Sequence, residues 1–237
     1  MMLRPPTRLA APWLVLAAAL AAPPGWSQAP EDPLEPVNRK LFAFNDALDR
    51  WILKPVAQGY DNVTPDPVQR RIGNFFENLG MPAVALNQLL QGKPKRSLSD
   101  LTRFVVNSTV GIGGLFDVAS ANGLPYHDED FGQTFAVWAG GRQGAFITLP
   151  FRGPSSVSHA TGLIFDAFTS PIRLVSPTRD QVILIAVDVV DDRADLLQTE
   201  QLVSGDRYLF IRDAYLQSRE FEINDGELED DPFLDDF

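Results

Sequence analysis

Two stretches around histidines hold the residue types that could do chemistry. His127 lies in YHDED, residues 126–130, where three consecutive carboxylates could offer oxygen ligands to a hard cation. Adjacent carboxylates point in different directions, however, and a calcium loop spaces its ligands around a turn that contains a glycine. The segment is therefore more typical of a solvated turn that caps the helix after it, and we predict no metal site here.

The second stretch, GPSSVSHATG at 153–162, brings Ser155 and Ser156 close to His159. A serine activated by a histidine could attack an ester, so a periplasmic serine hydrolase is one alternative. The stretch lacks the Gly-x-Ser-x-Gly elbow that presents a nucleophile, and a helix that begins at Ser155 would use the serines as caps. Neither a phosphate-binding glycine loop nor a zinc-ligand spacing occurs elsewhere. We therefore predict no enzyme and no cofactor.

The N-terminal segment 1–27 has the pattern of a secretory signal peptide. Arg4 and Arg8 give it a positive start, an apolar run follows over 10–22, and small residues precede an expected cut after Ser27. The run is too short to span a bilayer as a helix, which disfavours the alternative of an uncleaved anchor. We expect an exported protein.

The charge balance and the absence of cysteine exclude several classes of function. The chain has a formal charge of −11, and without the signal peptide 18 basic residues face 31 acidic ones. Nucleic acid is not an expected partner, because binding phosphates requires clustered Lys and Arg. With no cysteine in the sequence, disulfides, thiolate ligands and thiol nucleophiles are excluded, and stability must come from packing.

Apolar residues recur at spacings of three and four along most of the chain, which predicts an all-α fold. We expect a linker at 28–36, a single helical domain over 37–224 and an acidic, disordered tail at 225–237. The expected helices begin at Pro36, after TPDP at 64–67, at Pro82, at Ser97, near Leu115, at 129, at Ser155, near 182 and near Tyr208. Residues 144–151 form the best candidate strand.

Proline and glycine set the expected breaks between these helices. Pro55 should end or kink the first helix, and Gly80 with Pro82 should interrupt the second. SLSD at 97–100 resembles a capping box. No segment after the signal peptide has eighteen consecutive apolar residues, so we expect no membrane-spanning helix.

The segment NSTVGIGGLFDVA, residues 107–119, combines a helix end with three glycines and with apolar residues on both sides of the expected bend. Gly111, Gly113 and Gly114 should break the helix or let two helices approach closely. Taken alone, the segment also fits a corner in an ordinary soluble core.

Several longer segments resemble segments of one protein family, and they occur along the chain in the same order as in that family. They are DPLEPVNRKLFAFNDALDRWILKPVAQGY (32–60), NFFENLGMPAVALNQLLQGK (74–93), RFVVNSTVGIGGLFDVA (103–119), EDFGQTFAVW (129–138), LPFRGPSS (149–156) and RDAYLQSREFEINDG (212–226). The chain is similar to the MlaA/VacJ proteins over nearly all of its length after the signal peptide.

The resemblance implies helices arranged as a ring or disc around an amphipathic channel, in the periplasmic leaflet of the outer membrane. It implies a phospholipid transport component that maintains lipid asymmetry. Such a component removes misplaced phospholipids from the outer leaflet and hands them to a soluble periplasmic lipid carrier, next to a trimeric porin. It assigns the lipid channel or gate to Asn107, Val110, Gly111, Ile112, Gly113, Gly114, Leu115 and Phe116. Membrane or porin contact falls to Phe42, Phe44, Trp51, Phe75 and Phe76.

One departure from the family concerns the membrane anchor. Its members are usually lipoproteins acylated on a cysteine, and this sequence contains no cysteine. We therefore expect non-covalent retention at the membrane through apolar helix faces and a partner. A soluble periplasmic scaffold without a lipid role stays as a further alternative.

Overall fold

The computed structural model describes residues 32–203 and 205–226, which form a mostly helical fold, as predicted. The elements in chain order are α2 (Glu35–Leu48), η1 (Asp49–Leu53), α3 (Lys54–Val63), α4 (Asp66–Leu90), α5 (Pro94–Thr109), α6 (Val118–Ala121), α7 (Phe131–Trp138), β1 (Phe146–Leu149), β2 (Gly153–Ser156), α8 (Val157–Thr169), η2 (Pro171–Leu174), α9 (Thr178–Asp195), η3 (Thr199–Leu202) and α10 (Arg207–Ile223). The expected signal peptide, residues 28–31 of the expected linker and the tail beyond Gly226 lie outside the described residues.

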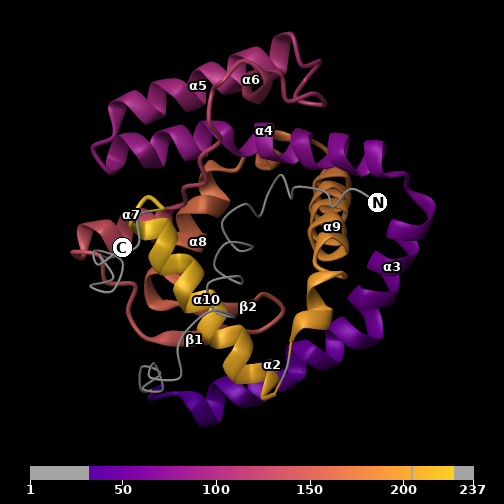
Figure 1. The fold of residues 1–237 in the computed structure, drawn as a ribbon, viewed down its shortest axis with the longest axis vertical. Helices are drawn as coiled ribbons and strands as arrows, with labels where there is room; N and C mark the ends of the chain where they lie inside the picture. Colours follow the sequence, from indigo (N-terminus) through magenta and orange to yellow (C-terminus); the bar gives the residue numbers. More distant parts are fainter. Residues whose placement is uncertain (1–31, 204, 227–237) are drawn as a thin grey trace, which may run out of the picture.

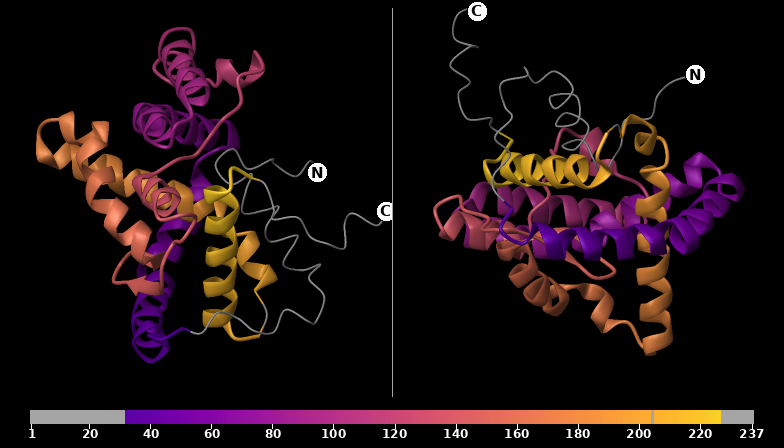
Figure 2. Two further views of the ribbon diagram at one scale, coloured as in Figure 1. Left: turned by 90° about the vertical axis from the view of Figure 1, so that its left-hand side faces the viewer. Right: turned by 90° about the horizontal axis from the view of Figure 1, so that it is seen from below.

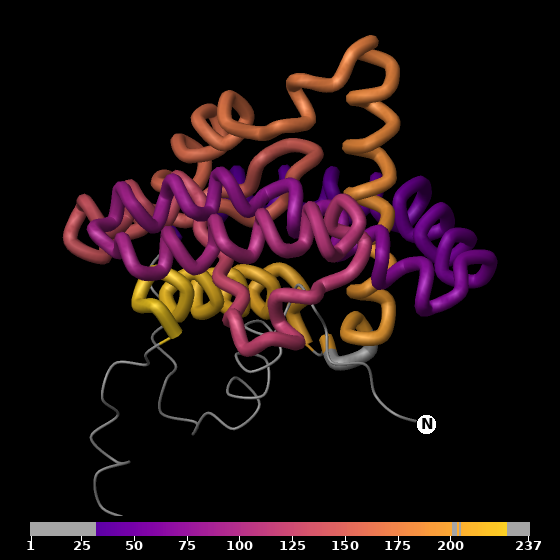
Figure 3. The backbone as a smooth tube through the Cα atoms, turned by 90° about the horizontal axis from the view of Figure 1, so that it is seen from above, coloured from indigo at the N-terminus to yellow at the C-terminus, as the bar shows by residue number. Residues whose placement is uncertain are grey.

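The helices run along the edge of a flat body. In Figure 1, α2, α3 and the pair α4–α5 form three sides of this edge, and α9 and α10 lie inside them. Seen edge-on, α10 lies along one face, while the end of α8 and the start of α9 extend from the opposite face (Figure 2, Figure 3).

The first helix continues through Pro55 instead of ending there. The π-helical turn η1 lies just before the proline, and the N–H of Lys54 reaches the carbonyl of Asp49, five residues back. This shift in bonding accommodates a residue that has no N–H to donate. The chain changes direction between α2 and α3 (Figure 1), so the proline coincides with a bend.

The expected interruption at Gly80 and Pro82 is wrong, because α4 runs unbroken from Asp66 to Leu90 with Pro82 inside it. An internal proline removes one backbone hydrogen bond and costs about 3 kcal/mol. Met81, Val84 and Ala85 around it are buried, α5 packs against the helix, and we attribute the continuity to this packing.

The capping box expected at 97–100 is also wrong. Helix α5 already begins at Pro94, and Ser97 lies inside it with its Oγ donating to the carbonyl of Ala85, 2.7 Å away. The hydroxyl therefore links α5 to α4 rather than capping a helix end.

The candidate strand is present as β1, with a partner that the sequence pattern did not indicate. Residues 153–156 form β2, antiparallel to β1, and α8 begins after them at Val157. The side chain of Ser156 accepts the N–H of His159 and caps α8, so the expected cap is shifted by one residue.

The kinds of side chains that are buried and exposed in this fold are unusual for a water-soluble protein. Among the described residues, twelve apolar side chains are buried against eighteen polar or charged ones, while thirty large apolar side chains are exposed. Buried asparagines form hydrogen bonds between segments that are far apart in the chain. The amide of Asn38, for example, donates to the carbonyl of Phe146 and accepts the N–H of Thr148. No helix in the described part of the chain has both the length and the apolar character needed to cross a bilayer.

Candidate functional site

The main candidate site is an open hollow of about 670 Å³ bordered by α2, η1, the β1–β2 turn, α9, η3 and α10. Its walls are mainly apolar and include Phe42, Ile52, Leu53, Leu196, Phe210 and Ile211. We call this space the apolar hollow. Its volume falls within the range of small-molecule sites, and apolar walls suit an apolar ligand.

Ion pairs around Glu200 hold the wall of the apolar hollow together. The Glu200 carboxylate lies 3.0 Å from Lys54, from Arg193 and from Arg207, and Arg193 also binds Asp49 at 2.7 Å. Burial alone would raise the pKa of Glu200, but hydrogen bonds and charges from Lys54 and Arg193 lower it to about 2. At neutral pH this carboxylate therefore ties together α3, α9 and α10.

A second hollow of about 550 Å³ lies between α4, the end of α8, η2 and α9. Among the described residues its lining holds six carboxylates and no Lys or Arg, namely Glu77, Asp128, Asp166, Asp188, Asp192 and Asp195. We call it the acidic hollow, although Phe76, Met81 and Ile172 give it apolar patches. The two hollows share Leu196, so they adjoin at the end of α9.

The glycine segment forms the expected break after α5. Ile112, Gly113 and Gly114 all have positive φ, and a Cβ on Gly114 would lie 2.6 Å from the Cβ of Asn78 on α4. The corner therefore packs closely on α4 and requires glycine at this position. Val110, Ile112, Leu115 and Phe116 are exposed, and the linings of the two hollows include none of the residues 107–116.

Asn107 holds this corner in place. Its Oδ1 accepts the N–H of Ala119 at 2.9 Å and its Nδ2 donates to Asp117 at 3.0 Å. The buried Arg103 lies 3.2 Å from the same carboxylate and donates to Ser120. Sequence reasoning missed Arg103, because no local spacing relates it to a carboxylate fourteen residues away.

The five aromatic residues assigned to membrane or porin contact differ in where they lie. Phe42 lines the apolar hollow and Phe76 the acidic one, with Phe75 in edge contact with Phe76 at 5.2 Å between ring centres. Phe44 is 43% exposed and Trp51 is 83% exposed. Phe44 and Trp51 are thus available to an external partner, whereas Phe42 and Phe76 face inward.

The carboxylates near His127 are directed to different partners. His127 Nδ1 lies 2.7 Å from Asp100, Glu129 accepts from Gln91, and Asp130 caps α7 by accepting the N–H of Gln133. The predicted cap of α7 is therefore confirmed, but the expectation of a solvated segment is wrong, because Glu129 is only 6% exposed. Within the described ranges, no group of three acidic or histidine side chains could hold a metal ion.

The serines near His159 do not form a nucleophile–base pair with it. Ser155 and Ser156 have no exposed surface, and the Nδ1 atom of His159 lies 2.8 Å from the hydroxyl of Tyr215. Burial, assisted by the charge of Arg219, lowers the pKa of His159 to about 4. The imidazole is therefore neutral and structural at physiological pH, which leaves the hydrolase alternative without a site.

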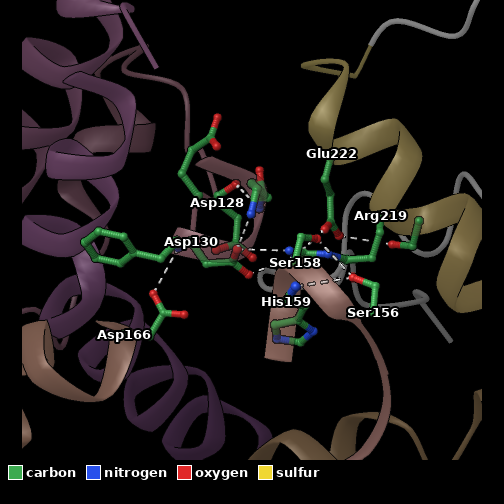
Figure 4. A network of polar contacts seen from close by, with 12 residues as sticks. Asp128, Asp130, Ser156, Ser158, His159, Asp166, Arg219 and Glu222 are labelled. Carbon is green, nitrogen blue, oxygen red and sulfur yellow. Dashed lines mark hydrogen bonds and ion pairs between the residues drawn. The ribbon is translucent and has the colours of Figure 1, made fainter. Parts of the chain in front are cut away.

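A buried ionic network joins α10 to α7 beside these serines (Figure 4). Two guanidinium nitrogens of Arg219 each lie 2.9 Å from an oxygen of Asp130, and one of them also lies 2.9 Å from Glu222. Burial raises the pKa of Glu222 to about 7 even though Arg219 opposes this. Asp166, whose pKa burial raises to about 6, accepts the first N–H of α7 at Phe131.

We predict that Glu222→Gln alters the pH dependence of stability. The folded carboxyl keeps its proton up to about pH 7, whereas the unfolded one ionises near its ordinary pKa of 4.5. Ionisation therefore favours unfolding as pH rises through this window. The free energy of unfolding of Glu222→Gln minus that of the wild type should therefore rise by about 3 kcal/mol between pH 4.5 and pH 7.

Urea denaturation across this pH range would measure the gain. The difference between the two proteins isolates Glu222 from the contributions of His159 and Asp166. Glu220→Gln, on the same helix but exposed, is the matched control and should show no such difference. If the free energies of unfolding of wild type and Glu222→Gln differed by the same amount at all pH values, the raised pKa of Glu222 would be contradicted.

Comparison with known proteins supports the sequence resemblance. The family model described as MlaA lipoprotein matches residues 30–222. Over 207 residues the chain is 35% identical to the intermembrane phospholipid transport system lipoprotein MlaA of Escherichia coli, covering 85% of this chain and 82% of that protein. The Haemophilus influenzae protein of the same name is 32% identical over 203 residues, covering 83% and 81%. An uncharacterised protein of Rickettsia bellii is 37% identical over 196 residues, covering 81% and 76%.

A solved structure has the same fold. It comes from work on the structural basis for maintenance of bacterial outer membrane lipid asymmetry. It matches with a TM-score of 0.71 and 33% sequence identity, covering 82% of this chain and 100% of that one. The family model, the named relatives and this fold agree, and the chain belongs to the MlaA lipoprotein family.

Proposed function

We propose that this protein is a phospholipid transport component of the outer membrane. It removes misplaced phospholipids from the outer leaflet through a channel that the apolar and acidic hollows form together, and hands them to a soluble periplasmic carrier. The observation that carries the proposal is a hollow with apolar walls and a charged edge inside a chain of this family.

The energetics of lipid movement explain why such walls are needed. A phospholipid with about thirty tail methylenes would lose roughly 24 kcal/mol if its tails met water, at about 0.8 kcal/mol each. Phe42, Leu53 and Phe210 offer the tails apolar contact, while the carboxylates and arginines nearby leave a hydrated route for the head group. No catalytic group is needed for this task.

Exposed apolar side chains support a position in the periplasmic leaflet. Large contiguous apolar surfaces on a protein mark contact with membranes or partners. We propose that Phe44 and Trp51 contact lipid or a trimeric porin, and that retention is non-covalent, since these 237 residues contain no cysteine to acylate. We propose that the glycine segment 107–116 is a gate at the edge of the fold, where Ile112 and Phe116 are exposed.

Leu196 provides the test, because it lines both hollows. We predict that the purified wild type carries bound phospholipid in native mass spectrometry. Leu196→Glu should reduce the occupied fraction at least tenfold, because it places a charge among the acyl chains. The matched control is Leu101→Glu on α5, since Leu101 is 44% exposed, against 41% for Leu196, and lines neither hollow.

The result separates the transporter from a scaffold. A soluble scaffold predicts no bound lipid in the wild type. Equal lipid occupancy in Leu196→Glu and Leu101→Glu would contradict the claim that the hollows bind the lipid. Circular dichroism of both variants confirms that they are folded before the comparison is made.

A further inference from the structure

Arg152 differs from the other arginines around the apolar hollow. It lies in the turn between β1 and β2 and contributes to the lining together with Arg193 and Arg207. Arg193 and Arg207 are held by carboxylates, with N–O distances of 2.7 to 3.1 Å. Arg152 is exposed, and among residues 32–203 and 205–226 it makes neither a hydrogen bond nor an ion pair. Its guanidinium is thus the cation at the hollow that can still bind an anion.

The turn that carries Arg152 is fixed by one side chain of α2. The Oδ1 atom of Asn45 accepts the N–H of Phe151 and its Nδ2 donates to the carbonyl of Leu149, both at 2.8 Å. The rings of Phe44 and Phe151 meet edge to face, 5.3 Å apart. Both hydrogen-bonding ends of the Asn45 amide therefore hold the turn against α2.

The backbone of the turn is strained at Phe151. Its φ of +65° lies in the left-handed region, which is unfavourable for a bulky residue and costs on the order of 1 kcal/mol or more. Such strain persists where the surroundings determine the conformation, and it concentrates at ligand-binding positions. Here the contacts to Asn45 and Phe44 hold a conformation that keeps Arg152 at the hollow.

The charge of Arg152 also reaches the neighbouring hollow. Burial raises the pKa of Asp166, and Arg152 is among the charges that oppose this rise. Asp166 lines the acidic hollow, so the guanidinium lies within electrostatic range of both spaces. A phosphate held by Arg152 at the apolar hollow would therefore also lie within electrostatic range of the Asp166 carboxyl.

We propose that Arg152 binds the phosphate diester of a phospholipid whose acyl chains occupy the apolar hollow. Asn45 is the positioning residue that holds the Phe151–Arg152 turn in place for this contact. A guanidinium fits phosphate oxygens with two parallel N–H donors, and such charge-assisted bonds are among the strongest in proteins. The proposal rests on the proposed function, since it names the chemical group by which the lipid is held.

The experiment compares a lipid that carries a phosphodiester head group with a lipid that carries no head group. The full-length protein is titrated in detergent micelles with dioleoylphosphatidylglycerol or with dioleoylglycerol, and occupancy is read by native mass spectrometry. Arg152→Gln should weaken binding of the phospholipid roughly tenfold and leave binding of dioleoylglycerol unchanged. Arg152→Lys should fall between, because an ammonium cannot make the bidentate contact. Arg142→Gln, an exposed arginine outside both hollows, should match the wild type for both lipids.

A double-mutant cycle tests the positioning role of Asn45. Asn45→Ala alone should lower the preference for phospholipid over dioleoylglycerol. If Asn45 acts through Arg152, adding Asn45→Ala to Arg152→Gln should lower that preference no further. Additive losses would mean that Asn45 acts independently of Arg152.

Other outcomes separate this proposal from the function on which it rests. Unchanged phospholipid binding in Arg152→Gln, or an equal loss for both lipids, would overturn the phosphate contact while leaving transport in place. If inorganic phosphate bound to the wild type but not to Arg152→Gln, while phospholipid binding was the same in both proteins, Arg152 would bind free anions and the lipid contact would be wrong. Failure of the wild type to bind either lipid would instead count against the proposed function.

Discussion

Gly162→Ala is expected to lower the free energy of unfolding by about 3 kcal/mol. Gly162 lies on α8 where it crosses α7, and a Cβ built on it would lie 2.2 Å from the backbone nitrogen and 2.7 Å from the Cα of Gly132. Backbone atoms cannot rotate away as a side chain can, so the two helices would have to separate. Urea denaturation followed by circular dichroism measures the loss.

Gly80→Ala is the matched control for this prediction. Gly80 also lies within a helix, α4, but no heavy atom from elsewhere in the fold lies within 4 Å of its added Cβ. The substitution should therefore stabilise the protein by about 0.5–1 kcal/mol, because alanine loses less backbone entropy on folding than glycine. A similar effect of both substitutions would show that the close crossing of α7 and α8 is not essential.

Arg219→Leu should have the second large effect, a loss of about 3–5 kcal/mol above pH 7. Arg219 is 8% exposed and neutralises both Asp130 and Glu222 (Figure 4). Leucine fills much of the same space but leaves two partly buried carboxylates without their counter-charge. The free energy of unfolding at pH 8, again from urea denaturation, gives the magnitude.

Neutralising the two carboxylates should remove most of this loss. In a background of Asp130→Asn and Glu222→Gln, the change Arg219→Leu no longer leaves buried charge unpaired, and asparagine can still cap α7. We expect the cost in that background to fall below half of its value in the wild type. An equal cost in both backgrounds would indicate that Arg219 contributes through packing of its side chain and not through its charge.

The helical architecture could be predicted from the sequence because it follows from local periodicity. Helix α9 is an example: VILIAVDVV favours a strand by composition, yet the apolar spacing continues to Leu197, and the segment is helical from Thr178 to Asp195. The errors arose where packing outweighs local signals. Pro82 stays inside α4, where its neighbours Met81, Val84 and Ala85 are buried. Ser97 stays inside α5, where its hydroxyl donates to the carbonyl of Ala85 on α4.

The hollows could not be predicted from the sequence, because their walls come from segments far apart in the chain. The turn at Phe151 depends on Asn45, 106 residues earlier, and Glu200 is paired with Lys54 and Arg193 from other elements. The motif LPFRGPSS was apparent, but the importance of Arg152 within it depends on which arginines are already paired. Likewise, helical spacing could not separate the inward Phe42 from the exposed Trp51.

Photo-crosslinking tests most directly whether acyl chains occupy the hollows. A phospholipid with a diazirine in one acyl chain is bound to the wild-type protein and irradiated, and the labelled residues are identified by mass spectrometry. The account predicts adducts on the apolar hollow, at Phe42, Ile52, Leu53, Phe210 and Ile211. Adducts confined to the outer surface of α5, at Leu98, Leu101 and Val105, with none in the hollow, would contradict it.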